Sequence, residues 1–328
     1  GGMRGLGLAL LLSLLLAACS SAPHIPTDTR QQLSEHRQLS VPFIAQQDYY
    51  CGPAAIASIA HYRQLQADQQ TIAAMSFLPG RRGSLTPEMQ AASRRLGLMP
   101  YPLARSFSDL LREVDAGNPV LVLQNQGLSW FPQWHYAVVL GYDLASETLY
   151  LHSGEHPNYA LSFATFNATW ARADFWARVL VDSGNVPASA RPLPYLRSAN
   201  AFEETGQRAL AKAFYRKASQ HWPRQPEGWL ARANLAYADG DMAAASAHYR
   251  RALQQAPDNA SLWNNYAYAL DARSCADAAR AAIAKAVALA PDDSNIVASQ
   301  QELEGSSAND QRCPADTAFI EDHRADLP

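Results

Sequence analysis

The sequence predicts an α+β domain followed by an all-α repeat array, and three observations support this fold class. The chain has 328 residues, more than one domain usually needs, and its 48% hydrophobic against 17% charged residues is a globular composition. Segments with a helical pattern precede strand-like runs in the first half of the chain. A period of 34 residues then begins near residue 195. We therefore expect two folded units.

The N-terminal segment combines a basic start with a short apolar run. Arg4 precedes an apolar stretch at residues 6–16 that is too short to cross a bilayer as a helix. The Leu-Ala-Ala-Cys sequence that ends at Cys19 resembles the lipobox of bacterial lipoproteins. This resemblance implies a signal peptide at residues 1–19 and a lipid anchor on Cys19. Ser20 in second place implies the outer membrane, facing the periplasm. An ordinary cleaved signal peptide with a chance cysteine is the alternative.

The first half of the chain after this segment divides into a polar stretch, a domain and a linker. Residues 20–40 lack periodicity and are expected to be a tether, residues 41–182 the first domain, and residues 183–194, with three prolines, the linker. The expected helices of the domain lie in its front half, at residues 53–63, 69–75, 87–96 and 108–116. The expected strands lie in its back half, at residues 119–123, 134–142, 148–152 and 175–181, with a short helix at 163–171. Helices followed by an antiparallel sheet are typical of an α+β domain.

After the linker, residue types recur every 34 positions. The recurring positions hold prolines, large aromatic residues and alanines: Pro223, Pro257 and Pro291; Tyr195, Trp229 and Trp263; Ala211, Ala245 and Ala279. The spacing resembles that of tetratricopeptide repeats, in which alanines let two helices pack closely and proline ends the second helix. The resemblance implies an all-α tetratricopeptide repeat solenoid at residues 195–304, with a cap helix at 294–304 and a groove for a protein partner. Residues 305–328 are expected to be a C-terminal tail.

A cysteine at the start of the first domain lies in a motif suited to nucleophilic chemistry. Cys51 directly precedes a Gly-Pro pair that opens an Ala-rich helix, so its sulfur is expected at the positive end of a helix dipole. This position favours the thiolate, which is the nucleophilic form. Gln46 lies a few residues upstream, where its amide can donate a hydrogen bond to an oxygen that gains charge during acyl transfer. For an isolated cysteine the alternative is a small buried core residue.

A second motif, Trp-His-Tyr-Ala-Val-Val-Leu-Gly-Tyr-Asp at residues 134–143, supplies a histidine on an expected strand. Together the two motifs resemble the papain-like cysteine peptidases of the bacteriocin-processing, double-glycine leader type and their free-standing relatives. The resemblance covers about residues 41–182. It implies that Cys51 is the nucleophile, that His135 is the general base and then the general acid, and that Gln46 is the oxyanion donor.

The residue that orients the histidine departs from the family pattern. The family usually has an aspartate on the strand after the histidine strand, whereas this chain has Leu-His-Ser-Gly at residues 151–154. If the turn between the two strands is centred on Ala145, His135 lies opposite Glu155 and diagonal to Ser153. Alignment with the family's aspartate position favours Ser153, whereas its negatively charged carboxylate favours Glu155. Both are therefore candidates for the residue that orients His135.

Other chemistry is less strongly indicated. Cys275 and Cys313 are two further cysteines in a compartment that permits disulfides, and a bonded pair and two free thiols are both open. His152 and His156 have a spacing that can bind metal on a helix, but strand-end surface histidines are the favoured interpretation, so no metal site or cofactor is expected. The net charge of −3 without a basic run argues against a nucleic-acid partner.

These features predict a periplasmic, lipid-anchored cysteine peptidase that hydrolyses a peptide or protein substrate through an acyl-enzyme on Cys51. The repeats would recruit the substrate or a protein partner. One alternative is a non-catalytic module that binds a peptide on a peptidase fold. Another is an acyltransferase or transpeptidase, which would share the acyl-enzyme and differ only in the acceptor.

Overall fold

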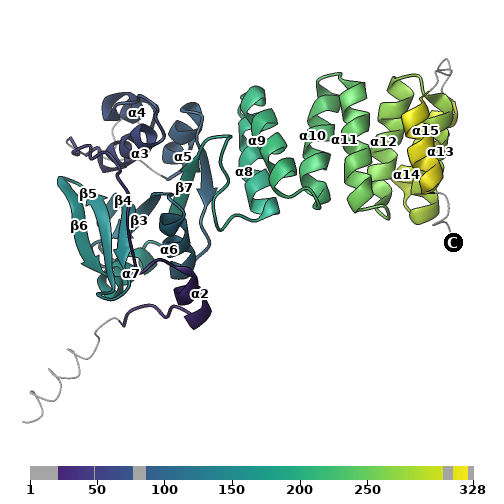
Figure 1. The fold of residues 1–328 in the computed structure, drawn as a ribbon. Coiled ribbons are helices and arrows are strands. Elements are labelled where there is room, and N and C mark those ends of the chain that lie inside the picture. The colour runs from purple at the N-terminus through teal and green to yellow at the C-terminus, as the bar shows by residue number, and fades with distance from the viewer. Residues whose placement is uncertain (1–20, 48, 77–85, 306–312, 324–328) are drawn as a thin grey trace, which may run out of the picture. The chain divides into compact units, whose positions relative to one another are not determined.

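The computed structural model of the chain describes residues 21–47, 49–76, 86–305 and 313–323 (Figure 1). The chain forms two compact units. The first unit comprises residues 1–182 and 187–190, and the second comprises residues 183–186 and 191–328. The predicted fold class is confirmed, because the first unit is an α+β domain and the second is helical. Cys19 and the expected signal peptide lie outside the described residues. Within the described residues, no helix is both long and apolar enough to cross a membrane.

The first unit is built on an antiparallel sheet with seven strands among the described residues. The strands are β1 (His36–Gln38), β2 (Met99–Pro102), β3 (Val120–Asn125), β4 (Trp134–Asp143), β5 (Thr148–Ser153), β6 (His156–Ser162) and β7 (Ala177–Val181). Their order is β2-β7-β3-β4-β5-β6, and β1 pairs with the last residues of β4. In the β3–β4 pair, Gln124 lies opposite His135. In the β4–β5 pair, His152 lies opposite Val138.

Six helices accompany the sheet in the described part of this unit. They are α2 (Thr27–Gln32), α3 (Cys51–Tyr62), α4 (Gln69–Ser76), α5 (Thr86–Arg95), α6 (Phe107–Asp115) and α7 (Phe163–Ala171). The Ala-rich helix α3 packs on β4, and residues 52–60 are all buried, because small side chains allow a close approach to the sheet. α6 and α7 begin after Ser106 and Ser162, whose hydroxyl oxygens accept hydrogen bonds from backbone amides of the first turn.

The prediction that residues 20–40 form a tether is wrong for most of this segment. Ile25, Leu33 and Leu39 are buried against the first unit. β1 pairs with the last residues of β4, an inner strand of the sheet, and the Arg30 guanidinium donates a hydrogen bond to the carbonyl oxygen of Leu144 at 3.0 Å. The stretch was expected to be a tether because it is locally polar, whereas its few apolar side chains are buried and Arg30 and β1 bond to residues more than 100 positions away.

The expected linker at residues 183–194 is shorter than predicted. α8 already begins at Pro192, because proline fits the first turn of a helix. The buried carboxylate of Glu113 accepts hydrogen bonds from the backbone amides of Ala188 and Ser189, at 2.9 and 2.8 Å. Residues 187–190 therefore belong to the first unit.

The second unit has eight helices among its described residues. They are α8 (Pro192–Glu204), α9 (Arg208–His221), α10 (Pro226–Ala238), α11 (Met242–Gln255), α12 (Ala260–Ala272), α13 (Ala276–Leu289), α14 (Ser294–Glu304) and α15 (Pro314–Asp322). The recurring alanines are buried between successive helices, which lie side by side in Figure 1. The turn residues Gly206 and Gly240 have φ of 80° and 81°, and Ser274 occupies the same turn of the third repeat with φ of 63°.

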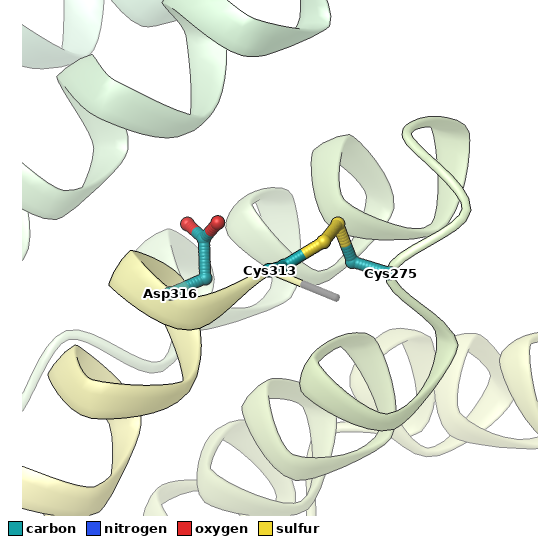
Figure 2. Close-up of side chains that lie close together, drawn as sticks. All are labelled: Cys275, Cys313 and Asp316. Atoms are coloured by element: carbon teal, nitrogen blue, oxygen red, sulfur yellow. A yellow bond between two sulfur atoms is a disulfide. The ribbon is translucent and has the colours of Figure 1, made fainter. Parts of the chain in front are cut away.

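The prediction that residues 305–328 form a C-terminal tail is also wrong, because α15 packs on the repeats. The Phe319 ring lies 5.8 Å from the Trp263 ring, centroid to centroid. The buried carboxylate of Asp316 forms ion pairs with Arg250 and Arg273. A disulfide joins Cys313, just before α15, to Cys275 at the start of α13 (Figure 2).

Candidate active site

Cys51 is the first residue of α3, and its side chain is half-buried where this helix meets β4. The sulfur accepts hydrogen bonds from the backbone amides of Gly52 and Tyr136, the residue after His135 in β4. Space favours glycine at position 52, since a Cβ added there would lie 2.7 Å from Sδ of Met89, which would have to move, and 3.2 Å from the Tyr136 ring. The Cys-Gly pair therefore lets the thiol approach the strand that carries the histidine.

The charge state of Cys51 differs from the sequence-based expectation of a thiolate. Burial raises the pKa of the Cys51 thiol above its ordinary value, and the backbone amides around the sulfur lower it by a smaller amount. Loss of water around the sulfur therefore outweighs the favourable helix terminus. In the free protein at neutral pH, Cys51 is a thiol.

His135 lies near the start of β4, and its ring is half-buried. Burial lowers the pKa of His135, so the imidazole is neutral at pH 7 and can accept a proton. Its Nε2 lies 2.8 Å from Oγ of Ser153 on β5. Its Nδ1 has no hydrogen-bond partner among the described residues. The ring therefore presents Nδ1 for proton transfer while Ser153 holds the opposite nitrogen.

Only one of the two candidates for the orienting residue reaches the ring. Ser153 does so as the last residue of β5. The chain turns at Gly154, which has φ of 61°, and β6 begins at His156. Glu155 is exposed in this turn and forms no ion pair within the described part of the chain. The expectation based on charge is therefore wrong, because β5 ends before the residue that would face His135.

Gln46 is brought close to the histidine by the same turn. Its backbone amide donates a hydrogen bond to the carbonyl oxygen of Gly154 at 3.2 Å. A Cβ added at Gly154 would lie 3.5 Å from Oε1 of Gln46 and 3.8 Å from Cε1 of His135. The Gln46 side chain and the His135 ring therefore both lie close to Gly154, where the φ of 61° favours glycine.

Two buried glutamines support the site and were not identified from the sequence. Gln69 on α4 accepts a hydrogen bond from the Gln47 backbone amide and donates one to the Ala45 carbonyl oxygen, at 3.0 and 2.7 Å. It therefore holds the segment that carries Gln46. Gln124 lies opposite His135 and donates a hydrogen bond to Thr169 at 2.8 Å. No sequence signal separates these glutamines from surface glutamines, because their partners are remote in the chain.

The structure also places the histidines and cysteines considered for other roles. His152 was expected on the surface but is buried, with Nε2 2.7 Å from the Val41 carbonyl oxygen. Its Nδ1 accepts a hydrogen bond from the Asn158 amide. In the described ranges, the one compact group of potential metal ligands is Cys275, Cys313 and Asp316 (Figure 2). Its two sulfurs are joined in the disulfide.

Comparisons with known proteins cover both units. Residues 38–177 match the model of the Peptidase_C39 like family, and residues 226–269 match a tetratricopeptide repeat model. No curated protein matches the chain. A crystal structure described as a C39-like peptidase from Bacillus anthracis is 21% identical, with 45% of this chain and 98% of that chain covered and a TM-score of 0.39.

A second solved structure is the first TPR of Spaghetti (RPAP3) bound to the HSP90 peptide SRMEEVD. It is 17% identical, with 38% of this chain and 96% of that chain covered and a TM-score of 0.33. The chain therefore contains a Peptidase_C39-like domain followed by a tetratricopeptide repeat region.

Proposed function

We propose that the first unit is a cysteine peptidase that cleaves a peptide or protein substrate through an acyl-enzyme on Cys51. The observation that carries the proposal is the hydrogen bond from the Tyr136 amide to the Cys51 sulfur. It ties the nucleophile to the strand position next to His135, whose ring is held by Ser153 from the other side. The contact of the Cys51 sulfur with the residue after His135 and the hydrogen bond of Ser153 to the His135 ring support a site made of a thiol, a neutral imidazole and an orienting hydroxyl.

The proposed reaction starts from the uncharged pair. His135 accepts the thiol proton through Nδ1 as the Cys51 sulfur forms a bond to the carbonyl carbon of the substrate. The Gln46 amide donates a hydrogen bond to the resulting oxyanion. His135 then gives the proton to the leaving amine, and the thioester remains. In the second half of the reaction, His135 takes a proton from water. The resulting hydroxide attacks the thioester and displaces the Cys51 thiolate. The thiolate then regains its proton from His135.

Exposed aromatic side chains next to the site support an apolar substrate segment. Trp130, Phe131 and Trp134 are 81%, 64% and 56% exposed, and they immediately precede His135. Asn125 orders this loop, because its side-chain oxygen accepts hydrogen bonds from the backbone amides of Gly127 and Gln133, at 2.9 Å each. An ordered loop that exposes large apolar side chains is a binding surface in most soluble proteins. We propose that it contacts apolar side chains beside the scissile bond.

The repeat groove supports recruitment of a different segment. A depression of about 670 Å³ is lined by apolar and acidic side chains, among them Leu193, Leu196, Leu230, Glu204 and Glu227. Oε2 of Glu227 is buried and has no hydrogen-bond partner among the described residues. We propose that the groove binds a peptide segment with apolar and basic residues. The lipid anchor on Cys19 and the outer-membrane, periplasm-facing location are part of the same proposal and rest on the sequence.

A non-catalytic peptide-binding module is the second candidate. The raised pKa of Cys51 and the hydroxyl of Ser153 in place of a carboxylate both favour it, because each makes the thiol less readily activated. The transpeptidase alternative shares every step up to the thioester, and it differs from the hydrolase only in the group that attacks next.

Labelling with a peptidyl probe that alkylates an activated thiol tests the proposal. A peptide acyloxymethyl ketone with an apolar residue at its reactive end is expected to form a thioether with Cys51 and to release its carboxylate. Cys51 is the one free cysteine in the described part of the chain. Mass spectrometry identifies the adduct. The variant His135→Ala is expected to reduce the labelling rate at least a hundredfold, whereas Glu155→Ala, on an exposed turn, should leave it unchanged. A folded protein that resists the probe at every pH between 6 and 9 would establish the non-catalytic candidate.

A further inference from the structure

The second unit contains a cavity lined by basic side chains, outside the groove described above. It has a volume of about 210 Å³ and lies between α9, α10 and the start of α11. Lys212 and Arg216 of α9, Arg232 of α10 and His248 of α11 line it. Lys212 and Arg216 are exposed, and Arg232 and His248 are half-buried, so two of the basic groups lie near solvent and two lie deeper.

The cavity exists because the second repeat lacks two large side chains that the first repeat has. In the first repeat, Phe202 and Phe214 are fully buried, and their rings stack with centroids 4.9 Å apart. The residues 34 positions later are Ala236 and His248. In the third repeat, Leu270 fills the position of Ala236. The second repeat therefore has a small and a polar side chain where the first repeat has a stacked aromatic pair and the third has the fully buried Leu270 and Ala282.

The two acidic residues at the cavity are engaged elsewhere. The carboxylate of Asp239 is paired with Arg208. Asp241 caps α11, with its side-chain oxygen accepting a hydrogen bond from the Ala244 amide at 3.0 Å. Across the described ranges, neither Lys212 nor Arg216 has a carboxylate partner. Lys212, Arg216 and Arg232 therefore have no ion pair within the described residues, and the charge of Asp241 offsets only part of theirs.

The deeper basic groups are held in place. The Arg232 guanidinium donates a hydrogen bond to Oγ of Ser219 at 3.0 Å and lies 5.2 Å from the centre of the Trp229 ring. The Trp229 and His248 rings are 6.1 Å apart. Burial lowers the pKa of His248 to about 4, with Arg232 and the two α9 cations acting in the same direction and Asp241 in the opposite one. The side chains thus face one another across polar space with excess positive charge.

We propose that this cavity binds the phosphate group of a phosphate-containing ligand. A phosphate group carries roughly −1.5 to −2 charges at pH 7 and offers three acceptor oxygens, which suits two guanidinium groups, an ammonium and an imidazole N–H. A carboxylate has one charge and two oxygens, so it would leave part of this positive charge unbalanced. Free phosphate and a phosphomonoester share this chemistry.

Isothermal titration calorimetry on the full chain tests the proposal at constant ionic strength. Inorganic phosphate and glycerol 3-phosphate are the two probes, and acetate is the carboxylate comparison. Saturable binding of one or both phosphates, at least tenfold tighter than acetate, is expected. Tighter binding of glycerol 3-phosphate would identify a phosphomonoester as the ligand, and tighter binding of inorganic phosphate would identify the free anion.

Matched variants assign the binding to the cavity. Arg216→Met removes an exposed positive charge at the cavity and is expected to weaken phosphate binding at least tenfold. Arg224→Met removes an exposed positive charge that does not line the cavity and should change binding less than twofold. The double variant Ala236→Phe with His248→Phe copies the first repeat and should abolish binding in a folded protein. Equal effects of Arg216→Met and Arg224→Met, or no saturable binding by the parent chain, would overturn the proposal.

Discussion

At the scale of single residues, the candidate site depends on a serine where related sequences are expected to have an aspartate. Ser153 fixes the orientation of the His135 ring through Nε2, but a neutral hydroxyl does not stabilise an imidazolium by charge. Burial favours the uncharged form of both reacting groups, because it raises the pKa of Cys51 and lowers that of His135. Both shifts favour an uncharged pair at rest, so in the proposed reaction proton transfer accompanies attack on the substrate.

The first prediction concerns Ser153→Asp. A carboxylate at Nε2 stabilises the imidazolium, so it raises the pKa of His135, and activity should rise or hold near pH 7. The acid limb of kcat/KM reflects protonation of His135 and is expected below pH 6.5 in the parent protein, because the pKa is lowered. In the variant this limb should move to higher pH. Rates of probe labelling or peptide turnover from pH 5 to 9 measure it.

Two controls belong to this prediction. Ser153→Ala removes the hydrogen bond without adding charge, and it should lower the rate about tenfold or less with the acid limb unmoved. Glu155→Ala should match the parent protein. If Glu155→Ala lost activity and Ser153→Asp left the pH profile unchanged, Glu155 would be the orienting residue during turnover.

The second prediction concerns Gly52→Ala. The added Cβ would meet Sδ and Cε of Met89 at 2.7 and 2.8 Å, so the fully buried methionine side chain has to move. We expect a loss of about 1–3 kcal/mol in the free energy of unfolding, measured by urea denaturation, together with slower labelling of Cys51. In a Met89→Ala background the same substitution should cost less, because the space is then free. Additive costs in the double-mutant cycle would contradict the contact.

At the scale of secondary-structure elements, the C-terminal helix shows how a short polar segment becomes part of a folded unit. α15 contributes Phe319 to the aromatic packing around Trp263 and Asp316 to a buried charge cluster. The disulfide joins two positions 38 residues apart. Three kinds of interaction therefore hold α15 on the repeats.

The third prediction concerns this disulfide. Replacing Cys275 and Cys313 by alanine removes a cross-link that, for a loop of 38 residues, stabilises by about 4 kcal/mol in the chain-entropy model. The variant should unfold at a lower urea concentration than the oxidised parent. Dithiothreitol should lower the stability of the parent toward that of the variant and leave the variant unchanged. An identical midpoint for the oxidised parent and the variant would contradict the prediction.

At the scale of the whole molecule, each unit encloses its own core. A repeat array gains stability from contacts between neighbouring repeats, so the second unit should fold without the first. Its boundaries matter, because residues 195–304 alone would lack the first turn of α8 and all of α15.

The fourth prediction follows from these boundaries. Residues 191–328 expressed alone should give a helical circular dichroism spectrum and a cooperative thermal transition. Residues 195–304 should melt at a lower temperature, because Trp263 and Tyr266 lose their cover by Phe319. Equal melting temperatures would indicate that α15 adds no stability, and a random-coil spectrum of the longer segment would show that the units fold only together.

The sequence by itself was sufficient to predict those features whose signal is local or periodic. The 34-residue spacing predicted the buried alanines, because a recurring helix pair needs small residues at the same place in each copy. The Gly-Pro pair after Cys51 predicted an Ala-rich helix at residues 53–63, since proline is suited to the first turn, and the observed helix begins two residues earlier, at Cys51. Cys51 and His135 were both candidates on these grounds.

Only the tertiary structure decided what depends on distant contacts. The choice of Ser153 over Glu155 required knowing where β5 ends, and the pKa direction of Cys51 required knowing how much water the sulfur loses. The burial of Ile25, Leu33 and Leu39 and the packing of α15 depend on partners far away in the chain. So do the hydrogen bonds by which Gln69 holds the residues on either side of Gln46. A local pattern reports the polarity of a segment, whereas burial and hydrogen bonding are set by whatever surface the folded chain brings against it.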